Sequence, residues 1–505
     1  MIDWQMAADK PKPAQALLLA GLCLPWLSPL AAGPSPTVLQ WLVTLACFAL
    51  VLPVLAQWRA DAARTVAQAW LLAALLSCAA GLLQYFGVSA ALSPWVNATG
   101  VGEAYANLRQ RNQFATLSNI GLAALLWFAA HARAHQARLI ASRAGLLAAA
   151  VLLAAGNAAS SSRTGLVQLL LLGALVWLWG GLRQPQTRRL LAVALAAYAV
   201  AALALPALLG LDPAEHGMWG RLSSGDLACG SRLTLWGNVL HLMAQKPGLG
   251  WGWGELGYAH FITLYPGPRF CELLDNAHNL PLHLAVELGL PAALLMCAGA
   301  GWLVLRERPW RERDATRQLA WSVLALILLH SLLEYPLWYG PFQLAFGLSL
   351  VLLWTTRPVH PGPALSRPAP ARAIRLGAAV LLLAVAAGAA WDYHRVSQIY
   401  LEPAARSAAY RDDTLEKIQA SWLFRRQARF AWLTITPLTR ANAAQINSEA
   451  QALLHFSPEP RVIEKLVESA VLLGRDDEAL FYLVRYRAAF PADHARWAAE
   501  NALLE

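Results

Sequence analysis

Long apolar runs separated by short polar connections occupy most of the chain. The runs lie at 14–31, 38–57, 66–88, 113–131, 139–156, 165–182, 190–210, 281–304, 316–338, 340–356 and 374–391. Each has about 17 to 24 residues, enough for a helix to cross a hydrocarbon core of roughly 30 Å. The first run could be a removable signal peptide, but others follow closely and no small-residue cleavage motif stands out, so we interpret it as a membrane helix. The pattern predicts an all-α, polytopic membrane protein with about eleven transmembrane helices.

A long connection at 211–280, the external loop, interrupts this pattern and mixes polar with apolar residues. In "SRLTLWGNVLHLMAQKP", Ser231 can cap a helix of about four turns that Pro247 ends. The next stretch, "GLGWGWGELGY", is too rich in Gly for a helix and too rich in Trp for a flexible spacer. Its aromatic faces suit a surface that meets sugar or lipid, although anchoring of Trp251 and Trp253 at the membrane interface explains them equally well.

The chain changes character again in its tail, residues 392–505. The stretch "SPEPRVIEKLVESAVLLGRDDEALFYLVRYRAAFPADHARWAAENALLE" predicts three short amphipathic helices with breaks at Gly474-Arg475 and at Pro491. Part of it resembles a tetratricopeptide-type (TPR-like) helical hairpin, which binds peptide or simply packs; we favour packing against the membrane domain. We therefore divide the chain into N-terminal membrane helices (1–210), the external loop (211–280), C-terminal membrane helices (281–391) and the helical tail (392–505).

Composition and charge support membrane insertion and indicate an orientation. The chain is 57% hydrophobic and 14% charged, with a mean hydropathy of +0.42, whereas a soluble domain has roughly 25% charged residues. The net charge of +10 could indicate a nucleic-acid partner, but the basic residues lie in alternate short connections rather than on one soluble face. By the positive-inside rule that side is cytoplasmic, and the external loop and tail face the periplasm of a Gram-negative bacterium. The basic residues are Lys10, Lys12, Arg59, Arg64, Arg133, Arg138, Arg143, Arg183, Arg188, Arg189, those of "RERPWRERDATR", Arg357, Arg367, Arg372 and Arg375.

Two of the six cysteines lie in the external loop. Cys229 and Cys271 could form a disulfide in an oxidising compartment, where it would close a loop of about forty residues. The sequence leaves this pairing open, since a disulfide needs Cα atoms within roughly 7 Å of each other. The other cysteines fall inside predicted spans, where a small buried hydrophobe explains them; they are Cys23, Cys47, Cys78 and Cys297.

Five polar segments gather at the external ends of the predicted spans, where ionisable groups are costly and tend to be functional. They are "NLRQRNQFATL" (107–117), "SSSRTGL" (160–166), "RLSSGDLACGSRLTLW" (221–236), "DNAHNLPLHLAVELGLP" (275–291) and "HSLLEYPLWYG" (330–340). On the deduced topology all five face one side and can converge on one external cavity. The planar fork of arginine matches phosphate oxygens, and histidine can take a proton from a hydroxyl near neutral pH. We therefore expect an anionic ligand and a proton-transfer step.

The arginines of these segments also have structural explanations. Arg109 and Arg111 can anchor at the membrane interface. Arg163 can bind headgroups at the start of its span, but its neighbours in "SSSRTG" can cap the helix while the guanidinium points outward. Arg232 lies in the first turn of the loop helix, where the helix dipole disfavours it, so a ligand-directed role is favoured.

The acidic and imidazole groups allow similar alternatives. His278 can be a helix-entry histidine held by Asp275 or Asn279, and its neighbour His283 lies nearly half a helical turn round from it and is the weaker candidate. Glu334 can pair structurally with the histidine four residues before it.

Motifs for other donors do not occur in the sequence. It contains no nucleotide-phosphate loop, no zinc-type His/Cys spacing and no paired-Asp motif. We therefore expect no metal or other cofactor. An activated donor must arrive already charged, and a polyprenyl-diphosphate glycan fits a membrane site lined by arginine.

Four motifs, in this order and topology, resemble those of bacterial O-oligosaccharyltransferases that glycosylate pilins and other exported proteins, within the superfamily shared with O-antigen ligases and O-antigen polymerases. They are "RQRNQFATLSNIGLAALLW", "SSSRTGL", "DNAHNLPLHLAVELGLP" and "HSLLEYPLWYGPFQLAFGL". The resemblance covers most of the chain from about residue 100. It implies a GT-C-like membrane fold and a metal-independent glycosyltransferase of the bacterial inner membrane. This enzyme would move a preassembled oligosaccharide from undecaprenyl diphosphate to a Ser or Thr hydroxyl of a pilin or other periplasmic protein.

The resemblance also assigns roles to residues. The family's essential loop histidine matches His278, and the arginines of its "SRTG"-like and "SR…LW" motifs match Arg163 and Arg232. The arginines would stabilise the departing diphosphate, while His278 would orient or deprotonate the acceptor hydroxyl. Asp275 or Asn279 would fix the imidazole tautomer. The remaining substrate-binding candidates are Arg109, Arg111, Arg221, Asp275, Asn279 and Glu334.

Three other functions compete with this interpretation. Ligation of O-antigen to the lipid A core is the nearest, because it uses the same donor and site chemistry, and O-antigen polymerisation is the next. The helical tail and the length of 505 residues favour a protein acceptor. A transporter or flippase would show Gly/Pro-broken helices in paired halves and charges at mid-membrane depth, whereas here the charges gather at one face.

Overall fold

Helices make up the regular structure of the part of the chain that the computed structural model describes, which is residues 13–30, 33–53, 62–131, 143–212, 217–223, 228–356 and 370–502. Every predicted apolar run contains a helix within these ranges. The basic residues Lys10, Lys12, Arg59, Arg133, Arg138, Arg357 and Arg367 lie outside them.

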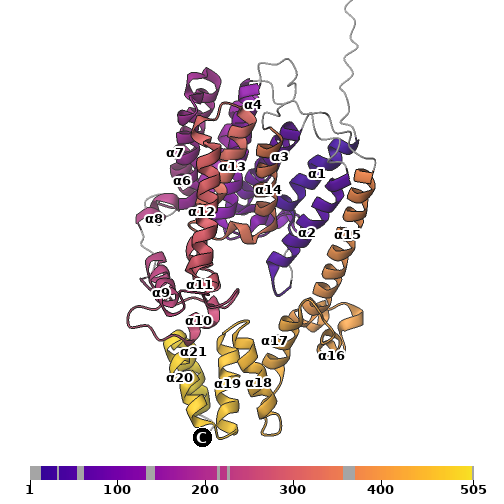
Figure 1. The fold of residues 1–505 in the computed structure, drawn as a ribbon, viewed down its shortest axis with the longest axis vertical. Helices are drawn as coiled ribbons and strands as arrows, with labels where there is room; N and C mark the ends of the chain where they lie inside the picture. Colours follow the sequence, from indigo (N-terminus) through magenta and orange to yellow (C-terminus); the bar gives the residue numbers. More distant parts are fainter. Residues whose placement is uncertain are drawn as a thin grey trace, which may run out of the picture.

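The N-terminal part is a helical bundle built around α4 (Figure 1). Helix α4 packs against α3, α5, α6, α7 and α13 (Ala315–Ser331). In the most apolar 18-residue stretch of α4, 83% is buried. Trp70 of α3 and Phe114 of α4 are among the largest fully buried side chains of this core. The N-terminal helices are α1 (Pro13–Leu27), α2 (Pro36–Val51), α3 (Ala62–Tyr85), α4 (Arg111–His131), α5 (Arg143–Ala159), α6 (Arg163–Leu178) and α7 (Pro185–Leu208).

Several helices present apolar surface that other helices leave uncovered. Among the described residues, five helices are long and apolar enough to cross a membrane: Ala62–Tyr85, Arg111–His131, Pro185–Leu208, Leu290–Arg311 and Ala373–Tyr400. In the last two helices, only 6% and 11% of the most apolar 18-residue stretch is buried. Exposed apolar surface of this extent needs lipid to cover it. Helices α1, α2, α5, α6 and α14 (Gly340–Thr355) are apolar as well but shorter, at 10–17 residues.

The run predicted as one span at 281–304 is divided into α11 (Leu280–Leu288) and α12 (Leu290–Glu307). The break falls at Gly289, whose φ of +88° suits glycine and whose added Cβ would lie 2.1 Å from the backbone oxygen of Gly248. The amide of Leu290 bonds the carbonyl of Pro247 at 2.9 Å. The prediction of one continuous helix was therefore wrong, because the turn after the loop helix docks against this point.

The run predicted at 316–338 also ends early. Helix α13 (Ala315–Ser331) stops before Glu334, and a 3-10 turn over Pro336–Trp338 leads into α14 (Gly340–Thr355). Pro336 cannot donate a helical hydrogen bond and disfavours helix in the residue before it. The residues between α13 and α14 consequently form a loop instead of continuing the helix.

The external loop contains α8 (Gly217–Ser223), α9 (Arg232–Gln245) and α10 (Leu256–Ile262). The prediction for α9 is confirmed, since the Ser231 hydroxyl accepts the amide of Thr234 at 3.2 Å and the helix ends just before Pro247. Leu235 and Leu242 of α9 pack on Val286 of α11 in a buried cluster of their own. The loop is therefore a folded unit.

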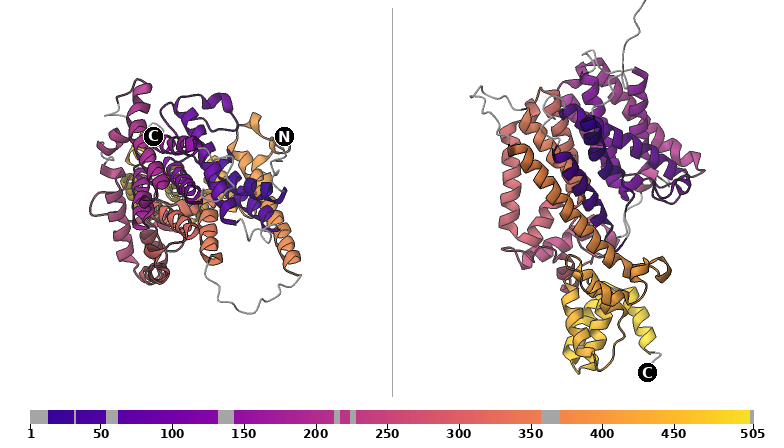
Figure 2. Two further views of the ribbon diagram at one scale, coloured as in Figure 1. Left: turned by 90° about the horizontal axis from the view of Figure 1, so that it is seen from above. Right: turned by 90° about the vertical axis from the view of Figure 1, so that its right-hand side faces the viewer.

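The tail follows α15 (Pro370–Ser397), which extends past its predicted end at residue 391 and carries the chain away from the bundle (Figure 2). The predicted breaks at Gly474-Arg475 and Pro491 are confirmed by α19 (Pro460–Leu472), α20 (Asp476–Ala489) and α21 (Pro491–Ala502). The tail also contains three helices that the sequence pattern did not predict: α16 (Thr414–Ile418), α17 (Arg425–Ile435) and α18 (Ala443–Leu454).

The tail contacts the external loop through α10, whereas the sequence favoured contact with the membrane domain. The Tyr258 ring stacks on His455 with centroids 3.8 Å apart, and the His455 Nδ1 lies 2.6 Å from a carboxylate oxygen of Glu255. Phe261 is buried in the core of the tail, and Arg485 donates to the carbonyl of Ile262 at 2.8 Å.

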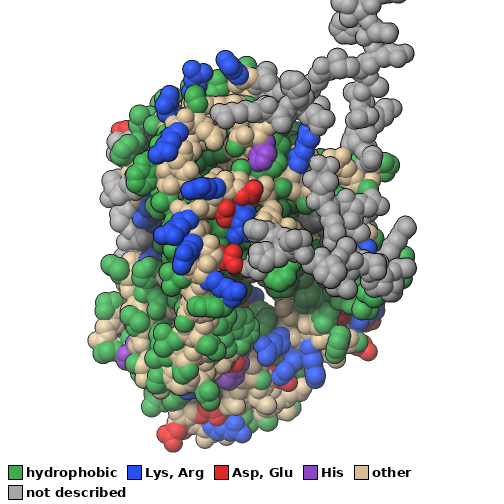
Figure 3. All heavy atoms as spheres, turned by 45° about the horizontal axis from the view of Figure 1, so that its top comes forward, with side chains coloured by type: hydrophobic (Ala, Val, Ile, Leu, Met, Phe, Trp, Pro, Cys, Tyr) green, Lys and Arg blue, Asp and Glu red, His purple; other side chains and the backbone are tan. Residues whose placement is uncertain are grey.

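Lys and Arg side chains spread over the end of the bundle that lies away from the tail (Figure 3). Among the described residues of this end, Arg317 of α13 pairs with Glu307 at 3.1 Å and with Glu312 at 2.6 Å. The described residues of the five polar segments lie at the opposite end of the helices.

Candidate active site

Glu334 is the centre of a hydrogen-bond network that joins three separate segments. Its buried carboxylate accepts the side-chain amides of Gln110 at 2.8 Å and Asn112 at 2.6 Å, both at the start of α4. Arg232, the first residue of α9, donates to the same carboxylate at 3.1 Å. The α13 C-terminus positions Glu334, because its amide bonds the carbonyl of His330 at 2.8 Å.

A fourth segment joins this network through Ser162. The Ser162 hydroxyl caps α6 by accepting the amide of Gly165 at 3.0 Å, and it donates to the side-chain oxygen of Asn112. Arg163 follows as the first residue of α6 and is exposed. The chain therefore places Arg163 beside the network, with Ser162 linking it to Asn112. We call Glu334, Gln110, Asn112, Ser162 and Arg232 the Glu334 network.

The fifth segment contributes His278, which lies in the turn that precedes α11. Its φ of +51° is in the left-handed region, which non-glycine residues adopt rarely. The backbone amide of His278 bonds the side-chain oxygen of Asn276 at 2.9 Å, and the imidazole meets the edge of Tyr335 with centroids 4.9 Å apart. Tyr335 follows Glu334 directly, so His278 lies beside the Glu334 network.

Asn279 organises the entry to α11. Its side-chain oxygen accepts the amide of Leu282 at 3.1 Å and its amide donates to the carbonyl of Leu332 at 3.0 Å. These bonds tie the His278 turn to the loop that carries Glu334. Asn279 therefore holds the helix entry rather than the imidazole, and Asp275 is exposed.

The imidazole of His278 is kept neutral by its surroundings. Burial lowers its pKa to about 4, with Arg232 adding to the shift and Glu334 opposing it. Its Nδ1 is buried without a hydrogen-bond partner in the described part of the chain. Burial raises the pKa of Glu334, but the imidazole of His330 and the charge of Arg232 outweigh it and hold that pKa below the ordinary value. The site thus combines a carboxylate, a fixed cation and a neutral imidazole.

The other arginines predicted to bind substrate lie outside the Glu334 network. Arg109, with φ +60°, is exposed and donates to the side-chain oxygen of Asn97 at 3.2 Å. Arg111 forms an ion pair with Glu103. Arg221 is half-buried on α8, which contacts α6 and α7.

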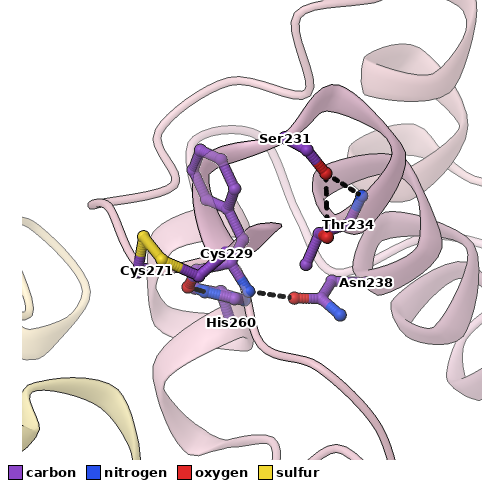
Figure 4. The surroundings of a disulfide bond; sticks show 7 residues. Cys229, Ser231, Thr234, Asn238, His260 and Cys271 are labelled. Carbon is purple, nitrogen blue, oxygen red and sulfur yellow. Dashed lines mark hydrogen bonds between the residues drawn. A yellow bond between two sulfur atoms is a disulfide. The ribbon is translucent and has the colours of Figure 1, made fainter. Parts of the chain in front are cut away.

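The structure joins Cys229 and Cys271 in a disulfide, with Cα atoms 5.3 Å apart (Figure 4). The backbone amide of Cys271 bonds the carbonyl of Cys229 at 3.2 Å. Beside it, the amide of Phe270 bonds the side-chain oxygen of Asn238 in α9 at 2.8 Å, and His260 of α10 bonds the carbonyl of Phe270 at 3.1 Å. These contacts fix the N-terminus of α9, from which Arg232 projects.

Sequence reasoning missed the roles of Gln110, Asn112 and Ser162. For Asn112 a signal exists, because Asn112, Thr116 and Asn119 recur at helical spacing along one face of an apolar helix. The Thr116 hydroxyl lies 3.0 Å from the Nδ1 of His330, and Asn119 donates to the carbonyl of Gly165 at 3.0 Å. This polar stripe continues the Glu334 network into the bundle.

Known families match three parts of the chain. Residues 148–297, which include Arg163, Arg232 and His278, match the family described as O-Antigen ligase. Residues 104–129 match the family described as Protein glycosylation ligase, and residues 318–504 match that described as Virulence factor membrane-bound polymerase, C-terminal.

Two curated relatives from Acinetobacter baylyi are similar to about half of the chain. A general O-oligosaccharyltransferase is 27% identical over 266 residues, which are 50% of this chain and 44% of the relative. A ComP-specific O-oligosaccharyltransferase is 25% identical over 249 residues, which are 49% of this chain and 43% of the relative. The matched region therefore spans less than half the length of either relative.

Proposed function

Because the chain belongs to the superfamily of bacterial O-antigen ligases and O-oligosaccharyltransferases, we propose that it transfers a preassembled oligosaccharide from undecaprenyl diphosphate to Ser or Thr hydroxyls of exported proteins. The observation that carries the proposal is the meeting of Arg232, Glu334 and His278 from three distant segments. A fixed cation beside a neutral base suits departure of a diphosphate and attack by a hydroxyl.

The arginines serve the donor in this proposal. The Arg232 side chain is 37% exposed, although one of its nitrogens is held by the Glu334 carboxylate, so its remaining donors can face a ligand. Arg163 is exposed at the start of α6. Together they bind the diphosphate and stabilise the charge that develops on it as the sugar departs. Glu334 acts as a positioning residue that holds Arg232.

His278 serves the acceptor. The hydroxyl oxygen bonds to the anomeric carbon while the bond from that carbon to the phosphate oxygen breaks, with inversion, and the electron pair stays on the diphosphate. The hydroxyl proton passes to the imidazole of His278. A pKa of about 4 keeps this imidazole unprotonated at neutral pH, as a base requires.

The proposal also includes a location in the membrane and a role for the tail. Eleven membrane crossings in the inner membrane would place the basic connections in the cytoplasm and the Glu334 network in the periplasm, in line with the positive-inside rule. The tail, as a TPR-like helical module docked on the external loop, would face the acceptor protein. These assignments are supported by the basic end of the bundle and by the position of the tail at the other end.

Ligation to the lipid A core is the second candidate, favoured by the match of residues 148–297 to the O-Antigen ligase family. Expression in a glycan-producing strain that lacks its own ligase separates the two. We expect glycan on an exported protein, lost in His278→Ala. Glycan only on lipid A core would replace the first candidate by the second, and an absence of transfer to either would refute both.

A further inference from the structure

Two tryptophans from distant parts of the chain form a parallel pair next to the candidate active site. The rings of Trp253, in the external loop, and Trp338, between α13 and α14, have centroids 6.0 Å apart and planes inclined by only 13°. Trp253 is 61% exposed. The pair therefore presents aromatic surface outward.

The backbone that carries Trp253 is fixed by its contacts with α11. The amides of Trp251 and Gly252 bond the carbonyls of Val286 and Glu287 at 2.9 and 3.0 Å. Gly250 has φ +72°, and a Cβ there would lie 2.4 Å from the Glu287 backbone. Trp251 points inward and donates to the carbonyl of Leu242 at 2.9 Å. Only the second tryptophan of "GWGWG" is left for a ligand.

Trp338 is also held in place. The indole of Trp41 in α2 donates to the Trp338 carbonyl at 2.8 Å. The buried ring of His283 meets Trp338 edge-on at 4.9 Å and Trp253 at 6.0 Å, and its Nε2 lies 3.4 Å from a carboxylate oxygen of Glu287. His283 thus supports both indoles from inside.

The position of this pair favours contact with the sugar part of a donor over contact with membrane lipid. Trp338 lies four residues after Glu334, at most about 14 Å along the chain, and Tyr335 between them touches His278. Interfacial tryptophans need only lie at headgroup depth. The two indoles are also parallel and held in place beside the candidate active site. Membrane anchoring does not need this arrangement, whereas stacking of a ring-shaped ligand does.

We infer that Trp253 and Trp338 form a subsite that stacks a pyranose ring of the donor glycan beyond the sugar that becomes linked to the acceptor. This inference rests on the proposed function. One face of a pyranose ring is a row of C–H groups, which pack on the electron-rich face of an indole while the hydroxyls stay in water. The subsite would make the enzyme prefer long glycans.

The test compares two donors with the purified full chain in lipid nanodiscs and a protein acceptor. One donor is undecaprenyl diphosphate with a single sugar, and the other carries an oligosaccharide that begins with the same sugar. We expect Trp253→Ala and Trp338→Ala to raise KM for the oligosaccharide donor by about tenfold. KM for the single-sugar donor should stay within about twofold, and Trp253→Phe should restore part of the preference.

Trp95→Ala is the matched control, because Trp95 is 75% exposed in another external connection; it should change neither KM. Equal loss with both donors would overturn the subsite. A rise in both KM values that is equal in Trp253→Ala and Trp95→Ala would show interfacial anchoring instead. Unchanged KM values in an active enzyme would refute the subsite alone, whereas a wild type that transfers from neither donor would refute the proposed function and the subsite with it.

Discussion

Arg232 and Glu334 are 102 residues apart in the sequence and form an ion pair of 3.1 Å. The Glu334 side chain is 8% exposed and that of Arg232 is 37% exposed, so the pair bridges the interior of the bundle and its external surface. A buried carboxylate is costly unless cations and hydrogen bonds compensate its charge. The pair therefore fastens the external loop to the bundle and sets the direction of the guanidinium.

Glu334→Gln should reduce both transfer and stability. The substitution keeps the size of the side chain but replaces one carboxylate oxygen by an NH2 group, which opposes the amide of either Gln110 or Asn112, and it removes the negative charge that pairs with Arg232. We expect a loss of about 1–3 kcal/mol in stability and at least about a tenfold loss in transfer rate. Thermal unfolding and initial rates with a lipid-linked glycan measure the two effects.

Glu103→Gln is the control for that variant. The Glu103 side chain, which pairs with Arg111, is 40% exposed compared with 8% for Glu334, and such exposed pairs contribute less than about 1 kcal/mol. Equal effects of the two substitutions would show that the Glu334 network has no special role.

The pH dependence of transfer should show the protonation of His278 and the effect of the Arg232 charge on its pKa. The base must be unprotonated, so activity falls as the pH drops through its pKa. In the free enzyme, reported by kcat/KM, this fall should occur near pH 4, the value to which burial and Arg232 lower the pKa. A bound diphosphate adds negative charge that favours imidazolium, so the fall in kcat should occur at higher pH.

Rate profiles from about pH 2.5 to 8 extend on both sides of a transition near pH 4 and measure the fall in kcat/KM and in kcat. His278→Ala should abolish transfer at every pH. Stability needs a parallel measurement, because a histidine with a lowered pKa destabilises the folded state as the pH falls below about 6.5, where only the unfolded chain takes up the proton. Identical midpoints for kcat/KM and kcat would place the diphosphate away from His278.

Removal of the disulfide should loosen the external loop. The double change Cys229→Ser and Cys271→Ser opens a cross-link with a sequence separation of 42 residues. We expect a loss of about 2–4 kcal/mol, because the cross-link restricts the unfolded chain. The temperature at which half the transfer activity is lost measures the effect, and dithiothreitol should have the same effect on the wild type. Cys297→Ser, at an exposed free cysteine, should leave that temperature unchanged.

Tyr258→Ala should detach the tail from the external loop. It removes the ring that stacks on His455 and borders the core of the tail. We expect the free energy of local opening to fall by about 1–3 kcal/mol, visible as faster amide exchange in α10, α19 and α20. Trp422→Ala, at a tail residue that is 85% exposed, serves as the control. Exchange that stays the same in both variants would contradict the described contact.

The helical pattern was readable from sequence where local chemistry decides it. Ser231 and Pro247 bound α9, and Gly474 and Pro491 divide the last helices, because caps and breakers act within a few residues. The break at Gly289 was not readable, since it depends on contact with Gly248 some forty residues earlier. An apolar run alone does not show where another backbone will dock.

The candidate site divides in the same way. Arg163, Arg232, His278 and Glu334 stood out because charge is rare in so apolar a chain. The links between them did not, since Gln110, Asn112 and Ser162 are neutral and their partners lie far away in sequence. Asn279 illustrates the limit of neighbour arguments: it lies next to His278 but bonds Leu332 and Leu282.

The tail is attached to the rest of the protein twice, covalently through α15 and by contact through α10. The second attachment closes a ring within one molecule, so it forms at an effective concentration on the order of millimolar. Even a weak contact then stays closed most of the time. Any partner that needs the same face of the tail must compete with this tethered helix, which sets a threshold on affinity and discriminates against chance encounters.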